Sequence, residues 1–171
     1  MTAKLRLRPL RSSDEQAARA AHDALGAEGF PFLLDYTPGE PWDDYVSRRE
    51  QNSRGERLPE RWVRSSFLAA TVAQELVGRA SIRHTLSPWL ESYGGHIGYA
   101  VVPGRRGRGH AKEILRQSLV IARSVGVQDV LIFCAVENIA SARVIEACGG
   151  EFEAVTPGPE PGTRQRRYWI R

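Results

Sequence analysis

VVPGRRGRGHAKEIL, residues 101–115, joins an apolar segment to a helical one through a basic turn rich in glycine. From Gly109 onward apolar residues recur at helical spacing, and Gly126 follows the last of them. We therefore expect a helix between these two glycines. The segment before the turn, residues 94–102, has the composition of a strand. The stretch thus predicts a strand that leads into a helix through a tight basic turn.

The turn has the features of an anion-binding site. The first turn of a helix presents backbone N–H groups without intrahelical partners, and the helix dipole favours negative charge there. Small residues at 107, 109 and 111 would let a ligand approach these groups, and three arginines add positive charge. A diphosphate would fit this arrangement, although a basic turn exposed to water has the same spacing.

Two common phosphate motifs are excluded. A loop that binds nucleoside triphosphates requires Gly-Lys followed by Ser or Thr, which the chain lacks. The dinucleotide fingerprint requires G-x-G-x-x-G, whereas Gly104, Gly107 and Gly109 have the reverse spacing. The spacing alone leaves another phosphate ligand and a solvated turn as alternatives.

The composition is that of a globular protein, with 42% of the 171 residues hydrophobic and 26% charged. A chain of this length can bury a proper core, so we expect one domain over residues 1–171. No apolar run approaches the length of a membrane span, and the first residues lack the apolar core of a signal peptide. These observations predict a cytoplasmic protein without a membrane partner.

The net charge of +4 permits an anionic ligand. It does not require nucleic acid, because basic residues recur along most of the chain instead of forming one block. Cys134 and Cys148 are too few for a disulfide framework and too far apart for a metal site. His84 and His96 also lack a clear cluster of ligands, so we expect no bound metal.

The remaining periodicities predict an α/β protein of the α+β type. Strands are expected at residues 4–10, 65–72, 76–86, 94–102, 130–136, 151–155 and 164–170. Helices are expected before Gly26, between 109 and 126, and at 141–148, with a short helix near 41–53 inside a long aromatic loop. The order predicts a mixed central sheet of about six or seven strands flanked by helices.

The stretch Arg106-Gly107-Arg108-Gly109-His110-Ala111 resembles the R-x-x-G-x-G/A signature of the GNAT superfamily of acetyl-CoA-dependent N-acetyltransferases. GGHIGYAVVPGRRGRGHA, VLIFCAVENIASARVIEACGGEFE and the terminal RRYWI are together similar to one branch with unassigned substrates. The similarity covers residues 62–171 well and the first 60 residues more loosely. It implies the GNAT fold, in which a splayed pair of strands binds coenzyme A (CoA), with acetyl-CoA as cosubstrate and an amine as acceptor.

The resemblance also assigns residues to the donor side. The N–H groups of residues 106–111 would hold the CoA diphosphate, while the backbone of Val101 and Val102 would pair with the pantetheine arm like an extra strand. Asn138 would lie near the pantetheine, and it is also suited to cap the helix that follows. The implied CoA-binding residues are Val101, Val102, Arg105, Arg106, Gly107, Arg108, Gly109, His110, Ala111 and Asn138.

His96 is the first candidate for the general base. It directly precedes Ile97 on the strand, where related branches often have glutamate, and an imidazole can accept a proton near neutral pH. A histidine that is merely hydrogen-bonded at the start of a strand would look the same in sequence. His84 is the alternative base. Because side chains alternate along a strand, only one of Arg83 and His84 can face the same cleft as His96.

The general acid is not defined, because Ile145 stands where many members of the family have a tyrosine. Ser141 is the preferred replacement, three residues after Asn138, although a serine there would also support the start of a helix. The other proton donors are Tyr99, Cys134 and water, and Cys134 is expected to pack in its apolar strand. The resemblance places the N–H of Val102 as the donor to the oxyanion.

The acceptor side is weakly defined. Most aromatic residues near it are expected to anchor the core or the loop, and four acidic residues would either attract a cationic amine or form a solvated loop: Asp35, Glu40, Asp43 and Asp44. We expect an N-acetyltransferase that moves an acetyl group directly to a primary amine in a ternary complex, as a monomer or homodimer. The alternatives are a CoA-binding regulatory domain without catalysis and a basic nucleic-acid-binding protein, although no nucleic-acid signature is present.

Overall fold

The computed structural model describes residues 4–171, and in this part of the chain the strands form two sheets. The first sheet has the order β1-β2-β3-β4 and is antiparallel throughout. Its strands are β1 (Arg6–Pro9), β2 (Ser65–Val72), β3 (Glu75–Arg83) and β4 (Ile97–Val101). The second sheet has the order β5-β7-β6 and is also antiparallel. Its strands are β5 (Val130–Ala135), β6 (Glu151–Pro157) and β7 (Arg164–Ile170).

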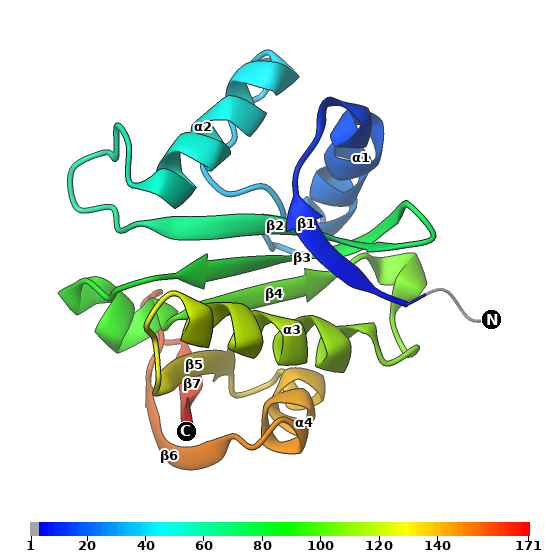
Figure 1. The fold of residues 1–171 in the computed structure, drawn as a ribbon. Coiled ribbons are helices and arrows are strands. Elements are labelled where there is room, and N and C mark those ends of the chain that lie inside the picture. Colours follow the sequence, from blue (N-terminus) through cyan, green and yellow to red (C-terminus); the bar gives the residue numbers. More distant parts are fainter. Residues whose placement is uncertain (1–3) are drawn as a thin grey trace.

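The helices cover both faces of the first sheet. Figure 1 shows α1 (Glu15–Gly26) and α2 (Trp42–Arg54) on one face and α3 (His110–Ser124) on the other, with α4 (Ile139–Ala147) beside the second sheet. Short helical turns are η1 (Ser12–Asp14), η2 (Leu90–Gly94) and η3 (Pro103–Arg105). None of the helices in residues 4–171 is long and apolar enough to cross a membrane. The expected α/β fold is confirmed, with its seven described strands divided between two sheets.

The β2–β3 hairpin is tighter than the sequence indicated. Glu75 already pairs with Val72, so the turn consists of Ala73 and Gln74 alone. Both of these residues are left-handed, with φ of 48° and 69°. This conformation is typical of the turns that match the twist of paired strands. The hairpin fixes the register of β3, the strand next to β4.

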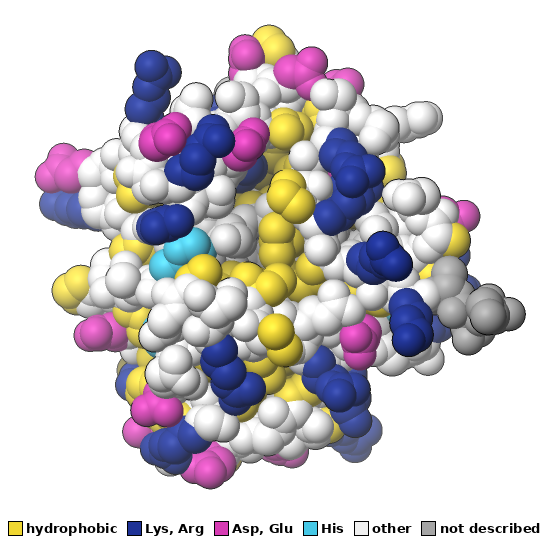
Figure 2. All heavy atoms as spheres, in the orientation of Figure 1, with side chains coloured by type: hydrophobic (Ala, Val, Ile, Leu, Met, Phe, Trp, Pro, Cys, Tyr) yellow, Lys and Arg dark blue, Asp and Glu magenta, His cyan; other side chains and the backbone are white. Residues whose placement is uncertain are grey.

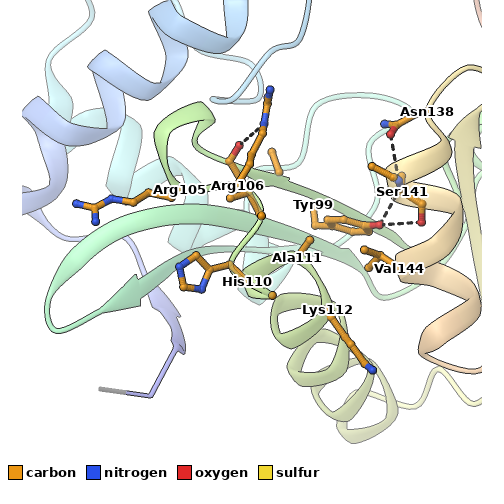
Figure 3. A pocket seen from close by; sticks show the side chains of 14 residues that line it. Tyr99, Arg105, Arg106, His110, Ala111, Lys112, Asn138, Ser141 and Val144 are labelled. Atoms are coloured by element: carbon orange, nitrogen blue, oxygen red, sulfur yellow. Dashed lines mark hydrogen bonds between the residues drawn. The ribbon is translucent and has the colours of Figure 1, made fainter. Parts of the chain in front are cut away.

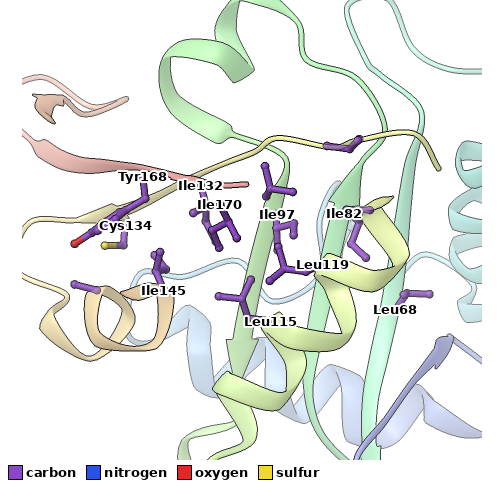
Figure 4. Close-up of a cluster of buried hydrophobic side chains, with 14 residues drawn as sticks. Leu68, Ile82, Ile97, Leu115, Leu119, Ile132, Cys134, Ile145, Tyr168 and Ile170 are labelled. Carbon is purple, nitrogen blue, oxygen red and sulfur yellow. The ribbon is translucent and has the colours of Figure 1, made fainter. Parts of the chain in front are cut away.

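The main core lies between α3, α4 and the two sheets (Figure 4). Leu115 and Leu119 of α3 belong to one buried cluster with Ile97 of β4, Ile132 of β5 and Ile145 of α4. Burying each such side chain contributes about 1.5–3 kcal/mol. Because α3 contacts both sheets in this way, it holds β4 and β5 in a fixed arrangement.

A second core anchors the long segment between α1 and β2. Phe32, Trp42 and Tyr45 are buried there against Phe67 of β2. The Tyr45 hydroxyl donates to the Leu34 carbonyl at 3.1 Å. These aromatic side chains therefore have the anchoring role expected of most of them, and the segment is folded onto the sheet.

Candidate active site

β4 and β5 are joined at their starts through His96 and Leu131. The N–H of His96 donates to the Leu131 carbonyl (2.7 Å), and the Leu131 N–H donates to Nδ1 of His96 (2.9 Å). Gly95 permits this approach, because its φ is +63° and a Cβ there would lie 2.5 Å from the Leu131 carbonyl oxygen. Beyond this point β4 is the edge of one sheet and β5 the edge of the other. The two strands are therefore open to a ligand along their remaining length.

A cavity of about 360 Å³ lies at this opening. Its walls come from β4, the basic turn, the first turn of α3 and the start of α4 (Figure 3). The residues implied for CoA binding that line it are Val101, Arg105, Arg106, Gly107, Gly109, His110, Ala111 and Asn138. Val102 and Arg108 are not among the lining residues. Most of the residues that the resemblance implies for CoA binding thus line this cavity.

The basic turn leaves the N-terminus of α3 open. Gly107 and Gly109 are left-handed, with φ of +74° and +79°, and a Cβ on either would meet no heavy atom within 4 Å. No side chain within residues 4–171 caps α3. The N–H groups of its first turn are therefore available to an anion, and the helix dipole favours one. The residues present fit the diphosphate that the resemblance implies.

Two arginines of the turn have acidic partners on neighbouring elements. Arg106 forms an ion pair with Glu28 at 2.7 Å, and Arg105 forms one with Glu75. Both pairs are largely exposed, so each contributes little to stability. Lys112 also lines the cavity, which the sequence analysis did not predict because only its place on α3 brings it there.

The backbones of Val101 and Val102 face in different directions. The N–H of Val102 donates to the Val77 carbonyl of β3 at 2.9 Å, so the expectation that it serves an oxyanion is wrong. Because polar backbone groups alternate along an antiparallel strand, those of Tyr99 and Val101 face away from β3. The Val101 carbonyl accepts a bond from Nε of Arg106 at 3.4 Å. Val101 therefore turns its backbone toward the cavity.

Tyr99 of β4 and Ser141 of α4 meet across the cavity, with their hydroxyl oxygens 2.8 Å apart (Figure 3). Burial raises the pKa of Tyr99 to about 12, although the bond to Ser141 opposes the rise. Tyr99 therefore keeps its proton at neutral pH. Asn138 accepts the N–H of Ser141 at 3.0 Å and caps α4. This cap fixes Ser141 at the first turn of the helix.

Ile145 and Cys134 belong to the core. Ile145 is fully buried, and Val144, its neighbour on α4, lines the cavity instead. Cys134 is also buried, and burial raises the pKa of its thiol. A thiol of this kind is a poor nucleophile at neutral pH. Both observations agree with the packing role expected of Cys134.

The two candidate bases are not brought together. Arg83 lies opposite His96, because its N–H donates to the His96 carbonyl at 2.8 Å. His84 is therefore on the other face of the sheet, where its Nε2 lies 2.9 Å from the Ser66 hydroxyl. Burial and the charge of Arg83 lower the pKa of His96. Since Nδ1 of His96 accepts from Leu131, its proton is on Nε2, and neither ring nitrogen is free to accept another.

A second cavity, of about 860 Å³, lies beside α2, β2 and β3. Apolar residues make much of its wall, namely Leu34, Trp62, Val63, Phe67, Pro88, Trp89 and Leu90. Ser81 and Arg83 of β3 contribute its floor. Ser81 pairs with Gly98, so the side chains of Ser81 and Tyr99 point to opposite faces of the sheet. The second cavity therefore lies on the face opposite the Tyr99 side chain, which lines the first cavity.

The acidic residues expected near the acceptor are mostly engaged. Asp35 lines the second cavity but pairs with Arg49 at 3.3 Å. Glu40 pairs with Arg48 at 2.7 Å. The Ser12 hydroxyl donates to Asp43 at 2.6 Å. These carboxylates therefore hold the segment around α2 in place.

A strand pair that opens beside an uncapped helix N-terminus is the arrangement of an α/β protein that can bind a phosphate-bearing ligand. Residues 4–151 match the model of the acetyltransferase (GNAT) domain, and the chain belongs to this family. It is an acetyl-CoA-dependent acetyltransferase, as the resemblance in sequence implied. A search of curated proteins found no match.

Solved structures support the fold. RimJ of Mycobacterium smegmatis in complex with CoA-disulfide is 20% identical with a TM-score of 0.70, and the match covers 97% of this chain and 81% of that one. An acetyl transferase of Salmonella typhimurium that modifies the N-terminal serine of ribosomal protein L7/L12 is 20% identical with a TM-score of 0.70, covering 99% and 95%. YncA of the same organism, with acetyl-CoA, is 16% identical with a TM-score of 0.65, covering 98% and 93%.

Proposed function

We propose that this protein transfers the acetyl group of acetyl-CoA directly to a primary amine within a ternary complex. The position of the two cavities carries the proposal, because the larger one lies on the face of the sheet opposite the Tyr99 side chain, which lines the smaller one. Separate cavities let both substrates be bound at the same time. A covalent acetyl-enzyme is disfavoured, because burial raises the pKa of the Cys134 thiol.

Acetyl-CoA is bound by the residues that line the smaller cavity. The N–H groups at the start of α3 bind the diphosphate, and the backbone of Val101 pairs with the pantetheine arm. When bound, acetyl-CoA supplies the acetyl thioester. The N–H groups of Tyr99 and Val101, which face away from β3, are placed to stabilise an oxyanion.

Proton transfer is assigned to the hydroxyl pair. Ser141 Oγ donates its proton to the leaving sulfur and takes the proton of Tyr99, 2.8 Å away, and Tyr99 regains a proton from water. A tyrosine with a pKa of about 12 holds its proton at neutral pH and can relay it without ionising first. This pair takes the place of the tyrosine that Ile145 replaces.

Water accepts the proton of the amine in this proposal, since His96 is engaged with Leu131 and His84 lies on the other face. His96 is then a positioning residue that keeps the two strands joined at the start of the opening. An unchanged pH–rate profile in a folded His96→Gln variant supports this assignment. Loss of the acidic limb of the profile, where a general base becomes protonated, would return the role of base to His96.

Isothermal titration with acetyl-CoA, followed by an amine panel monitored for free thiol, tests the function. Intersecting initial-rate plots are expected for a ternary complex, and parallel plots would contradict it. A regulatory domain without catalysis would bind CoA but release no thiol with any amine.

The partners are acetyl-CoA and the amine, without nucleic acid or membrane, in a single cytoplasmic domain over residues 1–171 that is a monomer or homodimer. Figure 2 shows Lys and Arg side chains dispersed over one face, with Asp and Glu among them, which supports the exclusion of nucleic acid. Salt-sensitive binding to duplex DNA that acetyl-CoA fails to compete would overturn this part of the proposal.

A further inference from the structure

We propose that the acceptor is an amine that carries a carboxylate and an apolar body, and that Arg83 binds this carboxylate in the larger cavity. The proposal rests on the amine acetylation proposed above and adds the chemical class of the acceptor. It starts from two guanidinium groups on β3, those of Arg79 and Arg83, which lie on the same face of the sheet.

Both guanidinium groups are bound by backbone carbonyls instead of carboxylates. Arg79 is only 3% exposed, and it donates to the carbonyls of Phe32 (3.1 Å) and Pro31 (3.2 Å). Arg83 donates through Nη1 to the carbonyls of Gly94 (3.1 Å) and Gly95 (3.3 Å). Within residues 4–171 neither arginine forms an ion pair. Two neighbouring positive charges are thus held in the protein without a counter-ion.

This arrangement is electrostatically costly in the absence of an anion. Burial, together with the charge of Arg83, lowers the pKa of Arg79 to about 9. Burial also lowers the pKa of Arg83. Buried charges are normally paired, so an anion beside these groups would remove an unfavourable interaction.

Gly98 of β4 lets both guanidinium groups pack against that strand. A Cβ at this position would lie 3.5 Å from Nη1 of Arg79 and 3.8 Å from Nη1 of Arg83. Arg83 therefore lies beside the backbone of β4. Because Tyr99, the next residue of β4, lines the donor cavity, a ligand bound by Arg83 lies near the strand at which acetyl transfer is proposed.

Arg83 is the arginine that a ligand can reach. It lines the larger cavity, and within the described residues its Nε and Nη2 have no hydrogen-bond partner. These two groups form the planar fork that binds a carboxylate through two parallel bonds. Arg49 pairs with Asp35, whereas Arg61 also lines the cavity but is exposed, so water screens its charge more than that of Arg83.

The walls of the cavity determine the rest of the ligand. Trp62, Trp89 and Phe67 offer aromatic surface above the floor, and the volume exceeds what a carboxylate and an amine require. Polyamines are disfavoured because positive charge predominates in the lining, where Arg49, Arg61 and Arg83 accompany Asp35 and Glu60. An amino acid with a large apolar side chain has the required combination of groups.

Matched product analogues test the carboxylate without the complication of a titrating amine. N-acetylphenylalanine and N-acetylphenylalaninamide differ only in the carboxylate, and binding can be followed by the fluorescence of the cavity tryptophans. We expect the acid to bind at least about tenfold more tightly than the amide. Arg83→Gln should abolish this preference, whereas Arg164→Gln, which removes an exposed charge from β7, should retain it.

Equal or tighter binding of the amide to the wild-type protein would overturn the proposal, and this comparison needs no variant. Circular dichroism establishes that Arg83→Gln is folded before its preference is interpreted. Thiol release with spermidine but not with phenylalanine would refute the acceptor class while leaving acetyl transfer to amines intact. Preferential binding of the acid, with no thiol release from any amine, would support the carboxylate site and refute the proposed function.

Discussion

His96 satisfies both backbone polar groups of Leu131, one through its own N–H and one through its ring. This double contact marks the place where the two sheets separate. Replacing His96 with Ala leaves a buried N–H without a partner, which costs about 1–3 kcal/mol. We expect the free energy of unfolding, measured with urea, to fall by that amount. CoA binding should also weaken, because β4 and β5 are no longer held at a fixed spacing.

His22→Ala is a matched control for this variant. Nδ1 of His22, a half-buried residue of α1, accepts the N–H of Leu33 at 3.0 Å, far in sequence from the strand opening. It should lower stability without changing CoA affinity. Unaltered stability of His96→Ala would show that the contact with Leu131 is dispensable.

His96 also makes the stability of the protein depend on pH. The folded state lowers the pKa of His96 and that of His84, both mainly through burial. The unfolded chain therefore binds protons first as the pH falls below about 6.5, so their contribution is complete above that pH and is lost below it. Melting temperatures between pH 8 and pH 5 should fall less in His96→Gln than in the wild type, and less again when His84→Gln is added. A parallel fall in all three proteins would contradict this origin.

Substitutions at the three glycines of the basic turn distinguish the effect of a left-handed backbone conformation from the effect of added side-chain volume. Gly107→Ala and Gly109→Ala place a side chain on a left-handed residue, which costs about 1 kcal/mol, while Gly104→Ala has equal room and no left-handed φ. We expect CoA affinity, measured by calorimetry, to fall about five- to tenfold in the first two variants and to remain unchanged in the third. A similar loss in all three would indicate that bulk alone matters.

Tyr99 and Ser141 should affect turnover more than binding. Ser141→Ala and Tyr99→Phe interrupt the hydroxyl pair, so we expect kcat to fall by about 10²-fold or more, with CoA affinity nearly unchanged. Tyr168→Phe removes a buried hydroxyl that binds Glu146 at 2.8 Å outside the cavity, and it serves as the control. Full turnover in both site variants would assign the proton to water.

Glu28 is expected to compete with the proposed diphosphate for Arg106, since the two side chains form an ion pair at 2.7 Å. Glu28→Gln should free the guanidinium and tighten CoA binding by about two- to fivefold at low salt. The matched variant is Glu56→Gln, which removes an exposed carboxylate that pairs with Arg54 instead. Weaker CoA binding in Glu28→Gln would indicate that this ion pair orders the turn for the ligand.

The sequence predicted the local structure around the basic turn well because its signal is local. Glycines with left-handed φ, a helix start and an apolar strand occupy adjacent positions, so residues 101–111 could be interpreted without knowledge of the remaining fold. Asn138 as a helix cap is local in the same sense.

The acceptor site proposed here could not be predicted from the sequence, because its contacts are distant in sequence. Arg83 meets the backbone of residues 94–95, and Arg79 meets that of residues 31–32. No spacing rule relates these positions. The direction of the Val102 N–H was also missed, since it depends on the register between β3 and β4.

The uncapped start of α3 has a consequence for the whole molecule. A diphosphate at that position would supply the hydrogen-bond acceptors that a capping side chain supplies in other helices. Since α3 packs against both sheets, a ligand bound at its N-terminus would stabilise this helix and the core around it, in addition to serving as a substrate. The cellular concentration of acetyl-CoA would then affect the thermal stability of this protein as well as its rate of acetyl transfer.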